Sequence, residues 1–92
     1  MREIDYSNQF ERDYKRERKS PKNKDLNKNL ELIINFLSSD VPLLRKHQDH
    51  ALKGEYAGTR ECHIKPDLLL IYFKTGKTLL TLVRLGSHSE LF

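Results

Sequence analysis

The chain has 92 residues, a net charge of +4 at pH 7 and a pI near 9.3, and its length fits one domain, residues 1–92, with a single core. Its one cysteine, Cys62, excludes an intramolecular disulfide, and no apolar run approaches the length of a membrane span. We therefore expect a cytoplasmic protein that does not enter membranes, and the positive charge favours an anionic partner such as nucleic acid.

The first half of the chain predicts one strand and two helices. Residues 2–6 are expected to form a short strand, and Ser7 or Asn8 can cap the helix that follows. Proline interrupts that helix at Ser20–Pro21 because it lacks a backbone donor. A second helix is expected from about Lys22 to about Leu37, because its leucines and isoleucines recur every three or four residues. Its apolar stripe is suited to cover one face of a sheet.

The second half predicts four short strands. Residues 41–51 are expected to form a loop, after which apolar runs alternate with turn residues. Connections this short require neighbouring strands to run antiparallel. Residues 68–73 are apolar on both sides, which indicates a central strand covered on both faces. The expected strands are Leu52–Tyr56, Thr59–Ile64, Leu68–Lys74 and Thr78–Leu85.

Together these elements predict an α+β domain, a small antiparallel β-sheet with two N-terminal helices packed on one face, in the order β-α-α-β-β-β-β. A short C-terminal helical turn is expected after the last strand, because Ser87 and Glu90 have the spacing of a capping box. His88 then takes the first position of this turn, with Phe92 one turn further on the same face. A helix N-terminus favours the neutral imidazole, so His88 is suited to act as a base. The alternative is a frayed terminus that only packs on the sheet.

His63 and Asp67 flank the tight connection 64–66, so their side chains start a short distance apart. A carboxylate beside an imidazole orients the ring and stabilises its charged form, which suits acid–base chemistry near neutral pH. The alternative is a surface histidine beside a turn-forming Pro-Asp pair.

Two further histidines and two arginines lie near the predicted strands. His47 and His50 fall in the preceding loop, where a histidine is usually solvated. Arg60 and Arg84 each lie near a strand end, and Arg84 is in phase with apolar residues, where a charge needs a partner. Phosphate is one such partner, because guanidinium binds it through paired hydrogen bonds. A structural salt bridge to an acidic residue such as Glu61 is the alternative.

The densest positive run lies around the break between the two helices. Most such runs are solvated helix faces, but this one is also suited to contact nucleic-acid phosphates without reading sequence. Its members are Lys15, Arg16, Arg18, Lys19, Lys22 and Lys24. No pair of histidines has the spacing of a zinc finger or of a His-Glu-x-x-His helix, so we expect no metal site and no cofactor.

Three motifs of the C-terminal half carry a family resemblance. They are Asp49-His50-x-Leu52-x-Gly54, Gly58-x-Arg60-x-x-His63-Ile64-x-Pro66-Asp67-Leu68-x-Leu70-Ile71-Tyr72 and Arg84-x-Gly86-Ser87-His88-Ser89-x-Leu91-Phe92. They resemble YafQ-type toxins of the RelE/ParE superfamily, which belong to bacterial toxin–antitoxin systems. The N-terminal half is compatible with the same family, and Glu61 stands where some relatives carry aspartate.

The resemblance implies a RelE-like fold and a ribosome-dependent endoribonuclease of a type II system, which inhibits translation by cutting mRNA in the ribosomal A site without a metal. The expected partners are a cognate antitoxin, the 70S ribosome and mRNA. We expect His50 and His88 to be the acid–base pair, and His63 and Asp67 to shape the site and its charge. The residues expected to contact the RNA are Arg60, Arg84 and Phe92.

Other functions fit the same residues. A non-catalytic RNA- or ribosome-binding module would use the basic surface and would not depend on the histidines. A ParE-like toxin directed at DNA gyrase belongs to the same superfamily, but it has no use for proton-transfer residues. A role in a repressor complex with the antitoxin would coexist with catalysis.

Overall fold

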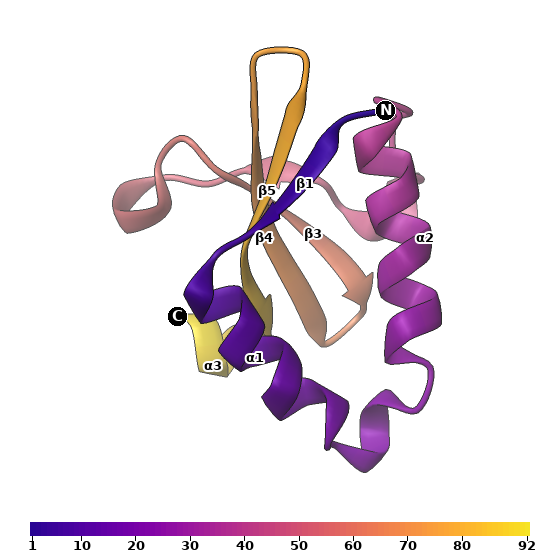
Figure 1. Ribbon diagram of the computed structural model, residues 1–92. Helices are drawn as coiled ribbons and strands as arrows, with labels where there is room; N and C mark the ends of the chain where they lie inside the picture. Colours follow the sequence, from indigo (N-terminus) through magenta and orange to yellow (C-terminus); the bar gives the residue numbers. More distant parts are fainter.

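The computed structural model describes all residues from Met1 to Phe92 and contains five strands and three α-helices (Figure 1). The strands are β1 (Glu3–Tyr6), β2 (His50–Ala51), β3 (Arg60–Lys65), β4 (Leu68–Thr75) and β5 (Leu79–Gly86). The helices are α1 (Asn8–Arg18), α2 (Leu26–Ser38) and α3 (His88–Leu91), and the 3₁₀ turns are η1 (Pro21–Asn23), η2 (Arg45–His47) and η3 (Gly54–Tyr56). None of the helices combines the length and the apolar character needed to span a bilayer.

All five strands join one sheet in the order β1-β5-β4-β3-β2. The meander from β2 to β5 is antiparallel, as the short connections predict. The chain enters β2 running opposite to β1, so three reversals bring β5 back parallel to β1, with Ile4 opposite Leu80. The predicted α+β class is therefore confirmed, although the parallel edge strand makes the sheet mixed instead of wholly antiparallel.

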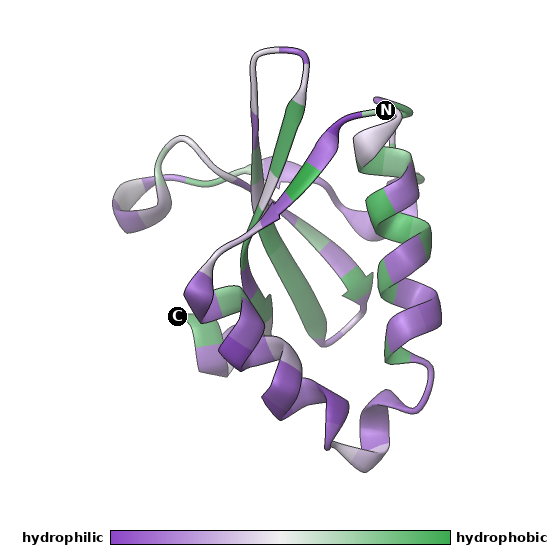
Figure 2. Cartoon of the chain, viewed as in Figure 1, coloured by the Kyte–Doolittle hydropathy of each residue, from purple (hydrophilic) through white to green (hydrophobic).

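The helices α1 and α2 cover one face of the sheet, as predicted (Figure 1). Ser7 caps α1, because its Oγ accepts a hydrogen bond from the Phe10 amide at 2.9 Å. Along α2, hydrophobic and hydrophilic residues alternate in the helical pattern that the sequence predicts (Figure 2). The buried apolar side chains of α2 pack with side chains of β3, β4 and β5 in the main core. They are Leu26, Leu30, Ile33 and Leu37.

The strand β4 lies at the centre of the sheet and is buried on both faces, as its sequence predicts. Its residues Leu68, Leu70 and Tyr72 belong to the main core under the helices. Leu69 and Ile71 point to the other face, where they pack against Leu91 of α3 in a smaller cluster. That smaller cluster forms the floor of the sheet face that the two long helices leave uncovered.

The second helix begins later than the sequence predicts. Residues 22–25 were expected to be helical, but Pro21–Asn23 forms the separate 3₁₀ turn η1. The Ser20 side chain caps this turn by accepting a hydrogen bond from the Lys22 amide at 3.4 Å. The φ angle of Pro21 is fixed, and the Lys22 amide donates to the Ser20 side chain. The regular helix therefore starts only at Leu26.

The predicted strand 52–56 is wrong. Only His50 and Ala51 pair with β3, and Gly54–Tyr56 forms the 3₁₀ turn η3 instead. Gly54 has a φ of +70°, a left-handed conformation that glycine adopts without steric cost and that ends an extended strand. The segment that pairs with β3 therefore begins at His50, two residues earlier than predicted, and His50 becomes part of the sheet.

Candidate active site on the open face of the sheet

Four strands align side chains in one row across the sheet face opposite α1 and α2. The ladder places His50 opposite Glu61, Glu61 opposite Ile71, and Ile71 opposite Arg84. Directly opposed residues of antiparallel strands point to the same face. Since neighbouring strands lie about 4.8 Å apart, the backbones of His50 and Arg84 are separated by roughly 14 Å. The row thus gathers chemically active groups from both ends of the meander on one face.

Glu61 faces two histidines at one end of this row. Its Oε1 lies 3.7 Å from Nε2 of His50 and 3.8 Å from Nε2 of His63. These distances are within ion-pair range but longer than a hydrogen bond. The Glu61 residue is only 5 % exposed, so its charge is shielded from water and is directed at the two rings. We call His50, Glu61 and His63 the Glu61 cluster.

From the sequence, Glu61 was an alternative salt-bridge partner for Arg84 and was not predicted to be a site residue. The signal for its actual position was present, because residues two apart on a strand share a face and Glu61 is two residues before His63.

Backbone carbonyls orient both rings of the Glu61 cluster. Nδ1 of His50 lies 2.6 Å from the Gln48 carbonyl oxygen, and Nδ1 of His63 lies 3.2 Å from the Pro66 carbonyl oxygen. A carbonyl can only accept, so each ring donates through Nδ1–H. The neutral ring then carries its lone pair on Nε2, the atom nearest Glu61. Either ring can therefore take up a proton at Nε2.

A third histidine supports the cluster from within the fold. His47 is only 8 % exposed, and its Nδ1 donates to the His63 carbonyl oxygen at 2.7 Å. The prediction that His47 is solvated is therefore wrong, because η2 turns its ring against β3. The contact ties the loop that leads to His50 to the strand that carries His63.

Asp67 does not pair with His63 as the sequence suggested. The turn between β3 and β4 directs the His63 ring to the Pro66 carbonyl, and Glu61 supplies the nearby carboxylate instead. Asp67 is exposed and lines a small pocket together with Ser87 and Ser89, at the start of α3. Its charge is therefore placed next to the segment that carries His88.

The second group of site residues gathers around α3. The predicted capping box is present: Ser87 Oγ accepts from the Glu90 amide at 3.2 Å, and Glu90 Oε1 accepts from the Ser87 amide at 2.7 Å. The rings of His88 and Phe92 lie 5.0 Å apart between centroids, on the same face as predicted. Phe92 is 54 % exposed and meets the ring of Tyr56 edge-on at 5.7 Å. The Phe92 cluster comprises Tyr56, Arg84, His88 and Phe92.

Tyr56 was missed at the sequence level. It lies in the 3₁₀ turn η3, where no periodic pattern marks the direction of a side chain, and only the folded chain brings it to Phe92.

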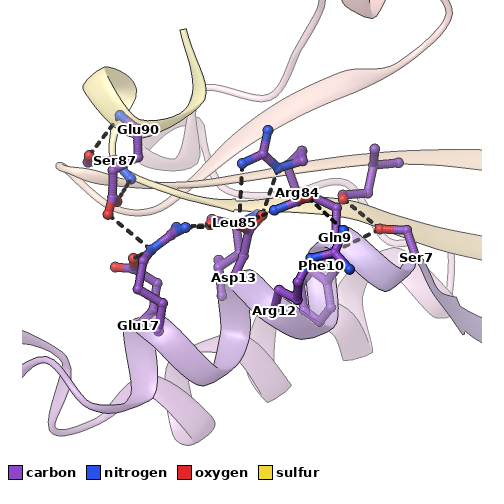
Figure 3. Close-up of polar contacts among 12 residues, drawn as sticks. Ser7, Gln9, Phe10, Arg12, Asp13, Glu17, Arg84, Leu85, Ser87 and Glu90 are labelled. Atoms are coloured by element: carbon purple, nitrogen blue, oxygen red, sulfur yellow. Dashed lines mark hydrogen bonds and ion pairs between the residues drawn. The ribbon is translucent and has the colours of Figure 1, made fainter.

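Arg84 is anchored by Asp13 of α1 (Figure 3). Nε of Arg84 donates to Asp13 Oδ2 at 2.8 Å and Nη2 donates to Oδ1 at 3.3 Å, while Nη1 donates to the Tyr56 hydroxyl at 3.1 Å. The salt-bridge alternative is therefore realised with Asp13 and not with Glu61. The hydrogen bond with Asp13 raises the pKa of Arg84 above its ordinary value. Of five guanidinium N–H groups two have no protein acceptor, and they are available to a phosphate.

Arg60 was expected to contact the RNA together with Arg84, but it lies on the opposite face of the sheet from the Glu61 cluster. Alternation along β3 turns Arg60 to the helix side, where its Nε donates to Asp49 Oδ1 at 3.0 Å. The hydroxyl of buried Tyr72 donates to the same oxygen at 2.8 Å. These bonds fix the residue directly before His50.

The basic run divides into one structural residue and five free ones. Arg16 pairs with Glu90 at 3.0 Å and donates to the Leu85 carbonyl at 2.9 Å, so it joins α1 to the chain end. Three of its five N–H groups have acceptors within the protein, so we assign Arg16 a structural role, although it was predicted among the phosphate contacts. The other five are exposed and make no ion pair within 4.0 Å: Lys15, Arg18, Lys19, Lys22 and Lys24.

A groove of about 750 Å³ lies on the other side of the molecule, between β1, α1 and α2. Its walls are largely apolar and include no histidine. Acid–base chemistry needs titratable side chains within reach of the reacting atoms, so we place the candidate active site on the open sheet face. No group of three or more His, Cys, Asp or Glu side chains has an arrangement that could hold a metal ion.

Comparison with known proteins gives a consistent result. Residues 2–92 match the family model described as "Bacterial toxin of type II toxin-antitoxin system, YafQ". The mRNA interferase toxin YafQ of Escherichia coli K12 is 40 % identical over 92 residues, which cover 100 % of this chain and 97 % of that protein. A putative toxin YafQ of Haemophilus influenzae is 42 % identical over 69 residues, covering 75 % of this chain and 68 % of the relative.

Solved structures of similar proteins share the fold over the whole chain. The crystal structure of YafQ from Escherichia coli BL21(DE3) has a TM-score of 0.86 at 36 % identity, covering 100 % of this chain and 99 % of that one. The Escherichia coli DinJ-YafQ complex gives 0.82 at 38 % identity, with coverage of 100 % and 99 %. A metal-bound toxin from Helicobacter pylori gives 0.83 at 43 % identity and covers both chains fully.

Proposed function

The chain belongs to the YafQ family of bacterial type II toxins, and on this premise we propose that it is an mRNA interferase that cuts messenger RNA on the ribosome. The observation that carries the proposal is the convergence of the Glu61 cluster and the Phe92 cluster on one open sheet face. A non-catalytic binding module would have no need of histidines whose Nδ1 is fixed and whose Nε2 is available for a proton.

The reaction is a transfer of the RNA phosphate from the 5′-oxygen of one nucleotide to the 2′-oxygen of the preceding one. A base removes the 2′-hydroxyl proton, the 2′-oxygen attacks phosphorus, and the bond to the 5′-oxygen breaks while an acid protonates that oxygen. The products are a 2′,3′-cyclic phosphate and a free 5′-hydroxyl. Two histidines near neutral pH can supply both proton transfers without a metal.

We assign the two proton transfers to His50 and His88, the exposed histidines of the two clusters. We assign to His63 and Glu61 the role of shaping the electrostatic environment of His50. Asp67 places a negative charge near the start of α3. The free N–H groups of Arg84 are suited to bind the negatively charged phosphorane, and exposed Phe92 is suited to stack on a base.

The proposed partners are the 70S ribosome, mRNA and a cognate antitoxin, all in the cytoplasm. The five exposed cations between Lys15 and Lys24, in α1, η1 and the residues that follow each of them, give a surface for ribosomal RNA phosphates. An antitoxin is proposed because the Escherichia coli YafQ relative forms a complex with DinJ. If saturating antitoxin left the cleavage rate unchanged, its proposed inhibitory role would be wrong.

Primer extension on an mRNA incubated with the purified protein tests this function, with and without programmed 70S ribosomes. We expect cuts inside A-site codons only when ribosomes are present, and loss of the cuts with His50→Ala or His88→Ala. The matched control is Asp40→Asn, since Asp40 pairs with Arg2 and Lys74 and touches neither cluster. Ribosome binding without cleavage by the unmodified protein would replace the proposal with the binding-module function.

A further inference from the structure

Helix α1 completes the part of the β5 edge that β1 leaves unpaired. The ladder between β1 and β5 ends at Tyr6 and Leu82. Beyond that point side chains of α1 and its cap take the place of a strand: Ser7 Oγ donates to the Val83 carbonyl, and Asp13 Oδ2 accepts from the Leu85 amide at 3.0 Å. Residues from the N-terminal part of the chain thus bind the β5 backbone at the residue before Arg84 and at the residue after it.

Asp13 is the centre of this arrangement (Figure 3). It has no exposed surface, and its two carboxylate oxygens accept five hydrogen bonds. Oδ2 accepts from Arg84 Nε and from the Leu85 amide, and Oδ1 accepts from Gln9, Arg16 and Arg84 Nη2. Every group that faces either oxygen is a donor, so an anion is required at this position.

We propose that Asp13 is a positioning residue for cleavage, which acts by fixing the guanidinium of Arg84 at the phosphate position. The inference rests on the proposed function and goes beyond it, because Asp13 lies on a helix and cannot reach RNA from a fully buried site. The paired bonds from Asp13 set the plane of the guanidinium, and Tyr56 fixes its third nitrogen. One N–H group then remains on each of the adjacent atoms Nη1 and Nη2, and such a pair is suited to bind a phosphate.

The chemical change that tests this role is Asp13→Asn, which preserves size and removes the charge. Whichever way the amide is turned, its NH₂ group faces donors, so one side of the guanidinium loses its acceptor. We expect the single-turnover cleavage rate on programmed ribosomes to fall about tenfold to a hundredfold, with ribosome affinity within about twofold of the unmodified protein. The control Asp40→Asn makes the same chemical change at an ion pair outside the site and is expected to keep its rate.

A double-mutant cycle separates positioning from general structural support. If Asp13 acts through Arg84, then adding Asp13→Asn to Arg84→Ala slows cleavage no further. Equal slowing by Asp13→Asn in both backgrounds would overturn the inference, and so would an unchanged rate in the single variant. Should Asp13→Asn fail to fold by circular dichroism, Asp13→Glu keeps the charge and displaces the carboxylate by one methylene, and an unchanged rate would again overturn it. Absence of cleavage by the unmodified protein would instead reject the proposed function.

Discussion

Glu61 lies directly opposite His50 in the ladder between β2 and β3, with its Oε1 3.7 Å from the His50 Nε2 atom. The carboxylate is shielded from water, so its charge acts on the ring at a distance where solvent does little to screen it. The same oxygen lies 3.8 Å from His63, which makes Glu61 the charged group common to both rings.

Replacing Glu61 with glutamine is expected to slow cleavage roughly tenfold, because the neutral amide removes the charge that faces both imidazoles and supports their orientation. The single-turnover rate on programmed ribosomes measures this effect. Glu61→Asp is the control, since it keeps the charge on the same face and is expected to retain most of the activity. Full activity of Glu61→Gln would show that the charge has no part in the reaction.

His47→Ala is expected to destabilise the protein by about 1–3 kcal/mol, because it removes a buried ring and leaves the His63 carbonyl without its donor. Urea denaturation measures the loss. His50→Ala is the matched control, since that ring is half exposed, and its change is expected within about 0.5 kcal/mol. Similar losses for the two variants would contradict a structural role specific to His47.

Simultaneous replacement of Lys19, Lys22 and Lys24 by alanine is expected to weaken ribosome binding and to lower the salt dependence of the affinity. Each phosphate contact contributes about one unit to the slope of log Kd against log salt, so a decrease of about two to three is expected. Titration of fluorescent protein with 70S ribosomes at several salt concentrations provides the slope. Lys77→Ala in the β4–β5 hairpin is the control and is expected to leave it unchanged.

Stability is expected to depend on Asp13 in acid. Burial raises the pKa of Asp13, but the hydrogen bonds from Arg84, Leu85 and Gln9 together with the Arg84 charge outweigh burial, so the pKa lies below its ordinary value. Such a group stabilises the fold above the unfolded pKa of about 3.9, and this contribution is lost as pH falls through the folded pKa. The stability difference between the unmodified protein and Asp13→Asn is therefore constant near pH 7 and narrows below about pH 4.

Urea denaturation between pH 7 and pH 3 measures that difference. Ile33→Val is a suitable control, because Ile33 is buried and does not titrate, and its stability difference is expected to stay constant over the same range. A difference for Asp13→Asn that is also independent of pH would contradict the assignment of the lowered pKa.

Gly86→Ala is expected to destabilise the fold by about 1–3 kcal/mol through overpacking. A Cβ at Gly86 would lie 2.7 Å from Arg16 Nη2 and 3.2 Å from Leu91 Cδ2. Thermal or urea denaturation measures the loss, and the background variant Arg16→Ala tests its cause. If the Arg16 contact is responsible, Gly86→Ala destabilises the Arg16→Ala variant less than it destabilises the unmodified protein. An equal loss of stability in both backgrounds would show that another contact is responsible.

Features set by neighbouring residues were predictable from the sequence. The capping box of Ser87 and Glu90 needs only a spacing of three residues, and it correctly placed His88 and Phe92 on one helical face. The central position of β4 followed from its continuous apolar run. Arg60 points to the opposite face of the sheet from His63. This was also predictable, because the two residues are an odd number of positions apart on one strand.

Features that depend on distant parts of the chain were not predictable. Asp13 and Arg84 are separated by 71 residues, and no local pattern selects one acidic residue of α1 as the partner of an arginine in β5. The burial of His47 depends on how η2 turns against β3. The position of Tyr56 depends on Gly54, whose left-handed conformation ends the strand that the composition favoured.

The joining of the two chain ends has a consequence for the order of events during biosynthesis. β1 pairs with β5, and Asp13 and Arg16 bind residues from Arg84 to Glu90, so these segments have partners that are translated about 70 residues later. Closing contacts across so long an interval is slow compared with forming a helix. A growing chain therefore carries α1 long before Arg84 and α3 exist. The end of the candidate site that contains Arg84 and α3 is therefore completed only after residues 84–92 have been translated, and a growing chain that has not reached them cannot assemble it.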